Sequence, residues 1–190
     1  MKPLDLSNAV ILDTETTGLD KWAQVIEVSI IDALHGNTIY TSLICPSKPI
    51  PVDATDIHGI TYDDVRHSPT IADAWHDIRT ALSGRDILIY NADFDTRLLL
   101  QSLRYSGLEF ASFDLQRQFI NELSTQCVML WYADFYQEED PYHGDYKWQR
   151  LTNACVQQEI DTSDLKAHRA SADCEMTRRL VHAVNAQLQA

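Results

Sequence analysis

Two acidic side chains stand where an apolar stretch near the start of the chain ends. From Val10 to Asp20 the sequence reads VILDTETTGLD, so a run of apolar residues leads directly to Asp13 and Glu15. Residues two apart share one face of a β-strand, and both carboxylates should therefore point the same way. Two like charges about 4 Å apart repel by roughly 4 kcal/mol at an effective dielectric of about 20. Because this repulsion is a large fraction of a domain's stability, the pair needs a compensating interaction and is a candidate functional site.

Two further carboxylates occupy positions of the same kind. Asp173 shares a helical stripe with three apolar residues at offsets of three, seven and eleven, so it should lie on the helix face that meets the sheet. The apolar residues are Met176, Leu180 and Val184. Asp95 lies in NADFD, where a strand should give way to a helix, and sites are often built at the carboxyl ends of strands. Each acid also has an ordinary explanation, as a strand end, a helix-dipole partner or the boundary of a helix face.

The first part of the chain predicts three consecutive strands. Val10 to Leu12 is apolar on both faces, as expected for a strand in the middle of a sheet. Two runs rich in β-branched residues follow, QVIEVSIIDAL and NTIYTSLICP, and Gly36-Asn37 between them is typical of a hairpin turn. The segment SPTIADAWHDIRTALSG then predicts a helix with Ser68 as its N-cap, Pro69 in its first position and Gly84 beyond its end.

The later part predicts strands that alternate with helices. RDILIYNADFD predicts a fourth strand, Ile87 to Tyr90, and a helix from about Asp93 to Tyr105 that Gly107 ends. Residues 108–150 are less regular and predict only a short helix around Gln126 to Ala133. Two more segments, WQRLTNACVQQEI and AHRASADCEMTRRLVHAVNAQL, are expected to be helices, the second from Ala167 almost to the C-terminus. Meandering strands followed by this alternation indicate an α/β protein with a mixed sheet and helices packed on it.

The composition favours one domain in a reducing compartment. The 190 residues are 45% hydrophobic and no Pro/Gly/Ser-rich stretch divides them, so residues 1–190 are expected to form a single domain. No signal peptide or membrane span is indicated, which favours a cytoplasmic protein without a membrane partner. The four cysteines are scattered without a C-x-x-C pair, which argues against a zinc site and a disulfide framework. The formal net charge of −13 suits a solvated acidic surface and is unfavourable for binding a polyanion without added cations.

The order of the acidic motifs resembles a known family of nucleases. DTETTGL, YNADFD, and His168 five residues before Asp173 resemble the three motifs of the DnaQ-like exonucleases, the His-containing (DEDDh) branch of the DEDD superfamily. IHGIT, Ile57 to Thr61, resembles the segment that these enzymes carry between the first two motifs. The resemblance extends from Val10 to about Val184 and is nearest in kind to the proofreading epsilon subunit of bacterial DNA polymerase III. It implies a ribonuclease H-like fold.

The resemblance implies a metal-dependent 3′–5′ exonuclease. Two divalent cations, Mg²⁺ or Mn²⁺, would be held by the oxygen ligands of Asp13, Glu15, Asp95 and Asp173. Such a pair of ions can activate a water and stabilise the leaving oxygen of a phosphodiester. His168 would act as the general base. The expected reaction releases nucleoside 5′-monophosphates from the 3′ end of DNA, preferably single-stranded, and all five residues would be catalytic.

The resemblance also implies which residues hold the terminal nucleotide. They are Thr16, Thr17, Gly18, Leu19 and His58. Core packing is the alternative for Leu19, and a capped turn is the alternative for His58. Near the last motif we expect a modest cationic and aromatic rim that tracks a single strand, with a solvated basic patch as its alternative. This cationic rim consists of Lys147, Trp148, Arg150, Lys166 and Arg169.

Some features depart from the family, and other functions stay open. Tyr90 stands where many relatives carry a histidine before Asn-Ala, so the fit beside the site should differ. Residues 108–150 depart most from the epsilon subunits, and no long segment follows the last helix, which favours a freestanding exonuclease over a tethered proofreader. The alternatives are an RNA 3′–5′ exonuclease of the same branch, a non-catalytic nucleic-acid- or protein-binding module, and a structural Ca²⁺-binding domain.

Overall fold

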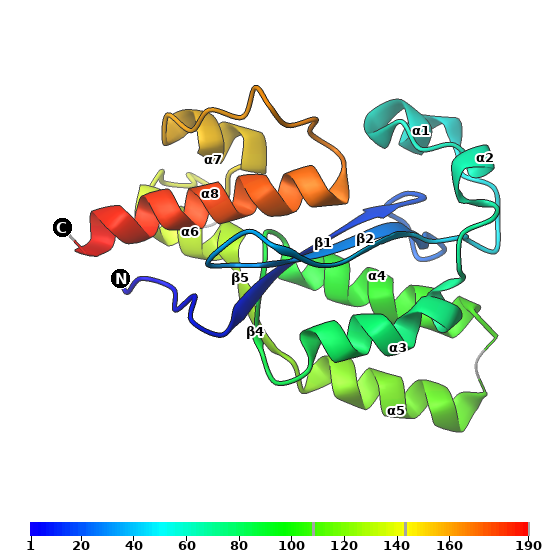
Figure 1. The fold of residues 1–190 in the computed structure, drawn as a ribbon. Helices are drawn as coiled ribbons and strands as arrows, with labels where there is room; N and C mark the ends of the chain where they lie inside the picture. The colour runs from blue at the N-terminus through cyan, green and yellow to red at the C-terminus, as the bar shows by residue number, and fades with distance from the viewer. Residues whose placement is uncertain (108, 143, 190) are drawn as a thin grey trace.

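A five-stranded mixed sheet forms the centre of the computed structural model, which describes residues 1–107, 109–142 and 144–189 (Figure 1). The strands are ordered β3 (Thr38–Leu43), β2 (Val25–Asp32), β1 (Ala9–Thr16), β4 (Asp86–Ile89) and β5 (Ser124–Cys127). β1, β2 and β3 are antiparallel neighbours, whereas β1, β4 and β5 run parallel. The predicted meander, followed by strands that alternate with helices, is confirmed.

Helices cover both faces of the sheet (Figure 1). One face carries α3 (Ile71–Leu82), α4 (Ala92–Tyr105) and α5 (Phe110–Asn121), and the other carries α6 (Val128–Tyr136), α7 (Leu151–Gln157) and α8 (Ala170–Gln189). The short helices α1 (Val52–His58) and α2 (Tyr62–Val65) connect β3 to α3 beyond one end of β1 and β2. In the described parts of the chain, none of these helices is long and apolar enough to cross a membrane.

Alternate residues of β1 face opposite helical layers. Val10 and Leu12 belong to the core beneath α3 and α4, whereas Ile11 packs in the core beneath α8. The same alternation turns Asp13 and Glu15 toward α8 and the intervening Thr14 toward α4. The register of β1 with β2 shifts between Glu15 and Thr16, so regular pairing ends just beyond the second acid. β1 thus delivers its two carboxylates to one face at its carboxyl end.

The predicted start of α3 was wrong by two residues. Thr70, not Ser68, is the N-cap: its hydroxyl accepts the Asp73 N–H, and the Asp73 carboxylate accepts the Thr70 N–H. This reciprocal capping box satisfies donors of the first helical turn, and Ser68 stands too far before that turn to do so. Pro69 therefore lies outside the helix rather than in its first position. Gly84 follows the helix as predicted, with a φ of 72°.

The region 108–150 is more regular than predicted. Neither α5 nor β5 was predicted, and Gln126 and Cys127, expected to be helical, end β5. β5 is a short edge strand of mostly polar residues, so it lacks the alternation of apolar residues that indicates a strand. The predicted helix exists as α6, which begins at Val128 and continues to Tyr136. The short helices α1 and α2 were not predicted either.

Candidate active site

Three of the predicted acids meet at the carboxyl end of β1. One carboxylate oxygen from each of Asp13, Glu15 and Asp173 lies within 4.8 Å of the other two. The first two share one face of β1, and the third comes from the first turn of α8. All three side chains are partly buried. Oxygen donors at this spacing can hold a divalent cation.

The packing of α8 explains how Asp173 reaches β1. The residues of its predicted apolar stripe are buried, namely Met176, Leu180 and Val184. Next to Asp173, the buried Cys174 thiol donates toward the backbone carbonyls of Ile11 and Ser29 at 3.6 and 3.4 Å. These contacts fix the first turn of α8 against two neighbouring strands, so the position of its carboxylate follows from core packing.

Asp95 approaches the same place from the opposite side of β1. It lies in the first turn of α4, is 4% exposed, and accepts a hydrogen bond from the Thr14 hydroxyl at 2.7 Å. It is not a member of the three-acid group, yet its charge raises the pKa of Asp13. We call the four acids the acidic cluster: Asp13, Glu15, Asp95 and Asp173. Thr14, which ties Asp95 to β1, was not predicted, although its place between two acids was a signal.

The pKa of every carboxyl group in the acidic cluster is raised, chiefly by burial. The pKa is about 8 for Glu15, about 7 for Asp95 and about 6 for Asp173, and that of Asp13 is well above its usual range. Repulsion between the carboxylates adds to burial, whereas the Thr14 hydrogen bond opposes it at Asp95. A cluster of this kind takes up protons near neutral pH, and a bound cation would stabilise its ionised form instead.

His168 lies beside the acidic cluster and before α8, which begins at Ala170 rather than at the predicted Ala167. Its side chain is exposed, and its φ of 61° lies in the left-handed region that residues other than glycine seldom adopt. Its backbone N–H donates to Oδ1 of Asp173 at 3.3 Å. The charge of His168 also lowers the pKa of Asp173, against the effect of burial. The structure thus brings this histidine to the three-acid group.

A partly buried ion pair that was not predicted holds the segment carrying His168. Glu27 on β2 is 5% exposed and accepts two hydrogen bonds from the Arg169 guanidinium, at 3.1 and 2.6 Å. It accepts a third from the Ala170 N–H at 2.9 Å. Bidentate pairing of this kind fixes orientation as well as charge. Glu27 interrupts the buried run VIEVSIID, so it could have been found by the same reasoning as Asp13 and Glu15.

The segment Thr16 to Leu19 continues from β1 in a closed turn. The Thr16 hydroxyl donates to the Gly18 carbonyl at 2.8 Å, and the Thr17 hydroxyl accepts the Gln24 N–H at 2.9 Å. Gly18 has a φ of 150°, a conformation largely restricted to glycine. Leu19 is 78% exposed, which rules out core packing. The structure therefore places these four predicted residues directly after the two acids of β1.

His58 ends α1 and is buried against this segment. Its Nδ1 accepts the Ile60 N–H at 2.9 Å, so the histidine does cap a turn, as the alternative expected. Its buried Nε2 has no hydrogen-bond partner within the described ranges. Burial lowers the pKa of His58, and the nearby Thr16 carbonyl opposes this shift. His58 therefore lies beside Thr16, at the carboxyl end of β1.

The predicted cationic rim is partly neutralised within the chain. Lys147 lies 2.8 Å from the Glu138 carboxylate, and Arg169 is bound to Glu27. Tyr90, which replaces the histidine of many relatives, is buried in the core on the α8 side and donates its hydroxyl hydrogen to the Gln149 carbonyl at 2.9 Å. Two cations of the rim are thus already paired with carboxylates of the chain. The Tyr90 side chain packs in the core.

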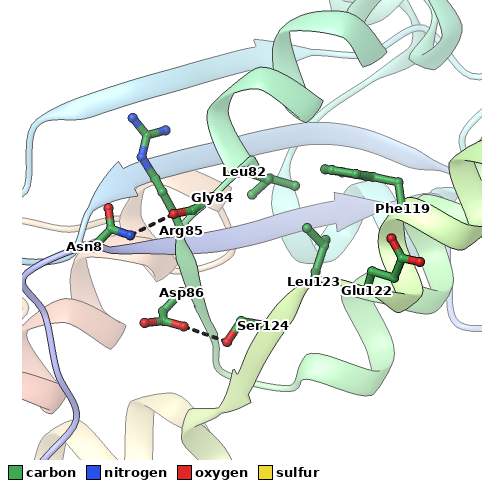
Figure 2. Close-up of a pocket in the computed structure, with 9 residues that line it drawn as sticks. All are labelled: Asn8, Leu82, Gly84, Arg85, Asp86, Phe119, Glu122, Leu123 and Ser124. Atoms are coloured by element: carbon green, nitrogen blue, oxygen red, sulfur yellow. Dashed lines mark hydrogen bonds between the residues drawn. The ribbon is translucent and has the colours of Figure 1, made fainter.

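The amino end of the parallel strands offers less chemistry. A hollow of about 360 Å³ lies there. Among the residues that line it, Asn8 donates to the Gly84 carbonyl at 2.8 Å and Ser124 donates to Asp86 at 2.6 Å, and dashed lines mark both bonds in Figure 2. These polar groups satisfy one another. Asp86 pairs with Ala9, which precedes Asp13 by four residues, about 13 Å along β1. The reactive side chains therefore gather at the carboxyl end, where open α/β sheets bind their ligands.

Comparisons of the sequence find exonucleases. The family model RNase_T, described as an exonuclease, matches residues 10–181. A protein of Escherichia phage 186 named uncharacterized exonuclease CP81 is 40% identical over 179 residues, which cover 92% of this chain and 87% of the phage protein. The DNA polymerase III epsilon subunit of Escherichia coli K12 is 24% identical over 181 residues, which cover 90% of this chain and 68% of the subunit.

Comparisons of the structure find the same kind of protein. Exonuclease X in complex with 5′-overhanging duplex DNA matches with a TM-score of 0.67 and 23% identity, over 94% of this chain and 92% of that chain. The zinc-bound form of the E. coli ExoI–ssDNA complex matches with a TM-score of 0.72 and 19% identity, over 97% of this chain and 42% of that chain. At these identities the likeness shows the fold, and the predicted ribonuclease H-like architecture is confirmed.

Proposed function

The chain belongs to the RNase_T family of exonucleases, and on this premise we propose that it removes nucleotides one at a time from the 3′ end of DNA. The preferred substrate in this proposal is single-stranded, and the product is a nucleoside 5′-monophosphate. One observation carries the proposal: four carboxylates from three separate elements converge at the carboxyl end of β1. We take residues 1–190 as a single exonuclease domain.

Relatives support a nucleic-acid substrate. Exonuclease X was solved in complex with duplex DNA that has a 5′ overhang, and ExoI in complex with single-stranded DNA. A 5′ overhang leaves the 3′ end of the partner strand recessed, and a single strand leaves it free. The epsilon subunit belongs to a DNA polymerase. These three relatives favour DNA over RNA for this chain.

Divalent cations fit the acidic cluster. Its donors are all carboxylate oxygens, the ligands that Mg²⁺ and Mn²⁺ prefer. The raised pKa values of Glu15, Asp95 and Asp173 indicate that the positive side chains nearby do not offset the negative charge of these carboxylates. Asp13, Glu15 and Asp173 would hold one cation, and Asp95 with Asp13 would hold a second. Bound there, the cations would lower the pKa of the attacking water and stabilise the leaving 3′ oxygen.

The remaining residues would position the substrate and move a proton. His168 would accept the proton of the attacking water, since an imidazole is the commonest general base and the backbone N–H of this residue bonds to Asp173. Thr16, Thr17 and Gly18 would offer backbone groups to the terminal nucleotide. The exposed Leu19 side chain would pack on its base, and the buried Nε2 of His58 would donate to the nucleotide.

The test compares matched 5′-labelled DNA and RNA strands in Mg²⁺, in Mn²⁺ and in chelator. We expect a ladder that shortens from the 3′ end with either metal and no degradation in chelator. Asp13→Asn should abolish the ladder, whereas Asp77→Asn, an exposed acid on α3, should leave it intact. Faster loss of RNA would reassign the substrate class. If the wild type degraded neither polymer, the catalytic proposal would fail and a binding module would replace it.

A further inference from the structure

An exposed tryptophan flanked by cations lies just beyond the Thr16 to Leu19 segment. Trp22 is 52% exposed, and the Nζ atoms of Lys21 and Lys48 lie 5.2 and 5.4 Å from the centre of its ring. The ring of Tyr105 is 5.8 Å away and tilted by 34°. With two arginines of α4 these residues form what we call the Trp22 patch: Lys21, Trp22, Lys48, Arg97, Arg104 and Tyr105.

The Trp22 patch is held rigidly on α4. The Tyr105 hydroxyl donates to the Lys21 carbonyl at 3.0 Å, and the Arg97 guanidinium donates to the Leu19 carbonyl at 3.4 Å. Between them, the Gln101 amide donates to the carbonyls of Asp20 and Ala23. The exposed ring therefore stands on a fixed backbone beside a hollow of about 440 Å³, so little order need be gained when a planar group stacks on it.

The cations of the patch are available for a ligand. Within the described ranges, no carboxylate lies within salt-bridge distance of Lys21, Lys48, Arg97 or Arg104. The neighbouring Asp20 carboxylate instead accepts the Trp22 N–H at 2.7 Å. By contrast, Lys147 and Arg169 of the cationic rim are paired. In a chain of net charge −13, four cations without an ion-pair partner in those ranges, set around an exposed aromatic ring, are a local positive surface.

Helix α4 connects the Trp22 patch to the candidate active site. Helix α4 carries Asp95 in its first turn and Tyr105 at its end, ten residues or about 15 Å farther along its axis. The chain from Thr16 to Trp22 runs between the same two places, and Arg97 bonds to its middle at Leu19. A strand whose 3′ end lies at the acidic cluster could therefore extend over the patch.

We propose that the Trp22 patch binds the unpaired nucleic-acid strand on the 5′ side of the terminal nucleotide. This inference rests on the proposed function. A base stacks on Trp22, and the lysines and arginines contact the phosphates on either side of it, the combination that single-strand binding sites use. Stacking and phosphate contacts do not distinguish one base from another, so the patch should have no base preference. Because stacking on Trp22 requires an unpaired base, the patch favours single strands over duplexes.

The first test is the dependence of the Michaelis constant on strand length. With the wild type, KM should be about tenfold lower for a strand of about 15 nucleotides than for one of about 3 nucleotides. Trp22→Ala should bring the ratio of the two constants close to one, and Trp22→Phe should restore most of it. Tyr142→Ala, which removes another exposed aromatic ring, is the matched control and should leave the ratio unchanged.

The second test uses salt. The Lys21→Gln and Lys48→Gln double variant should reduce the slope of log affinity against log salt by about 0.7 for each phosphate that a lysine no longer neutralises. A wild-type enzyme that degrades both strands, with Trp22→Ala leaving both the length ratio and the affinity unchanged, would overturn the patch and spare the proposed function. A wild type that degrades neither strand would overturn the function on which the patch rests.

Discussion

The acidic cluster and the Trp22 patch lie at opposite ends of one short segment and have opposite character. Asp13 and Glu15 are partly buried among like charges, and their pKa is raised by burial first and by repulsion second, whereas Trp22 is exposed beside the ammonium groups of Lys21 and Lys48. The net charge of −13 therefore hides a local separation of charge. At the acidic end cations from solution must be recruited, and at the basic end the chain supplies its own.

Removal of one cluster acid should separate chemistry from binding most sharply. Asp13→Asn should lower kcat by at least about a thousandfold, because the loss of a metal ligand forfeits several kcal/mol of transition-state stabilisation. Binding of a single strand to the Trp22 patch should change by less than about threefold. Single-turnover kinetics and fluorescence anisotropy measure the two effects. Equal losses of affinity and rate would show that the two regions are not separate.

A smaller loss of rate is expected when His168, the proposed proton acceptor, is removed. His168→Ala should lower kcat by about a hundredfold, the usual contribution of a general base, and should leave KM for long strands nearly unchanged. It should also remove the acidic limb of the pH–rate profile, because no imidazole remains to be deprotonated. A profile that kept this limb with His168 absent would assign the proton transfer to another group.

Glu27 should affect the rate only by positioning the segment that carries His168. Glu27→Gln leaves the Arg169 guanidinium and the Ala170 N–H with a weaker partner, so the segment carrying His168 should shift and kcat should fall about tenfold. Glu175→Gln is the matched control, since Glu175 pairs with Arg178 and Arg179 along α8. A loss of stability without a change in the pH–rate profile would reduce Glu27 to a purely structural role.

The last effect concerns the stability of the fold rather than the rate. The pKa values of Asp173, Asp95 and Glu15, about 6, 7 and 8, exceed those of the unfolded chain, so the folded protein binds more protons. Without metal, the free energy of unfolding should therefore fall by several kcal/mol as the pH rises from about 5 to 8.

Urea unfolding in chelator and in Mn²⁺ would measure this decline. Mn²⁺ should abolish it, and Asp13→Asn should make the metal-free protein more stable at about pH 8, because one of the buried like charges is gone. Asp77→Asn should change neither value. Metal-free stability that rose with pH over this range would contradict the cluster electrostatics.

The acids were predictable because local rules place them. The period of a strand put Asp13 and Glu15 on one face, and the period of a helix put Asp173 on a buried stripe; the structure has both features. The fold class followed in the same way from the order of strands and helices. Ser68 was a wrong cap because two hydroxyls stood near the start of α3, and only Thr70 has an acid three residues later.

What the sequence did not reveal depends on contacts between distant segments. Thr14 holds Asp95 across 81 residues and Glu27 holds Arg169 across 142; each of the two strand residues stood out locally, but no local period identifies its distant partner. The Trp22 patch joins a loop after β1, Lys48 beyond β3 and the far end of α4. Polar β5 was missed because an edge strand needs no apolar alternation.

The most direct test of the central claim is the product of a single turnover. A DNA strand with a blocked 5′ end is mixed with excess enzyme in Mn²⁺, and the first released species is identified by mass. We predict a nucleoside 5′-monophosphate from the 3′ terminus, formed by the wild type and by Asp77→Asn but not by Asp13→Asn. Release of a 3′-phosphate, of an internal fragment, or of the same product by Asp13→Asn would contradict the proposed two-metal exonuclease.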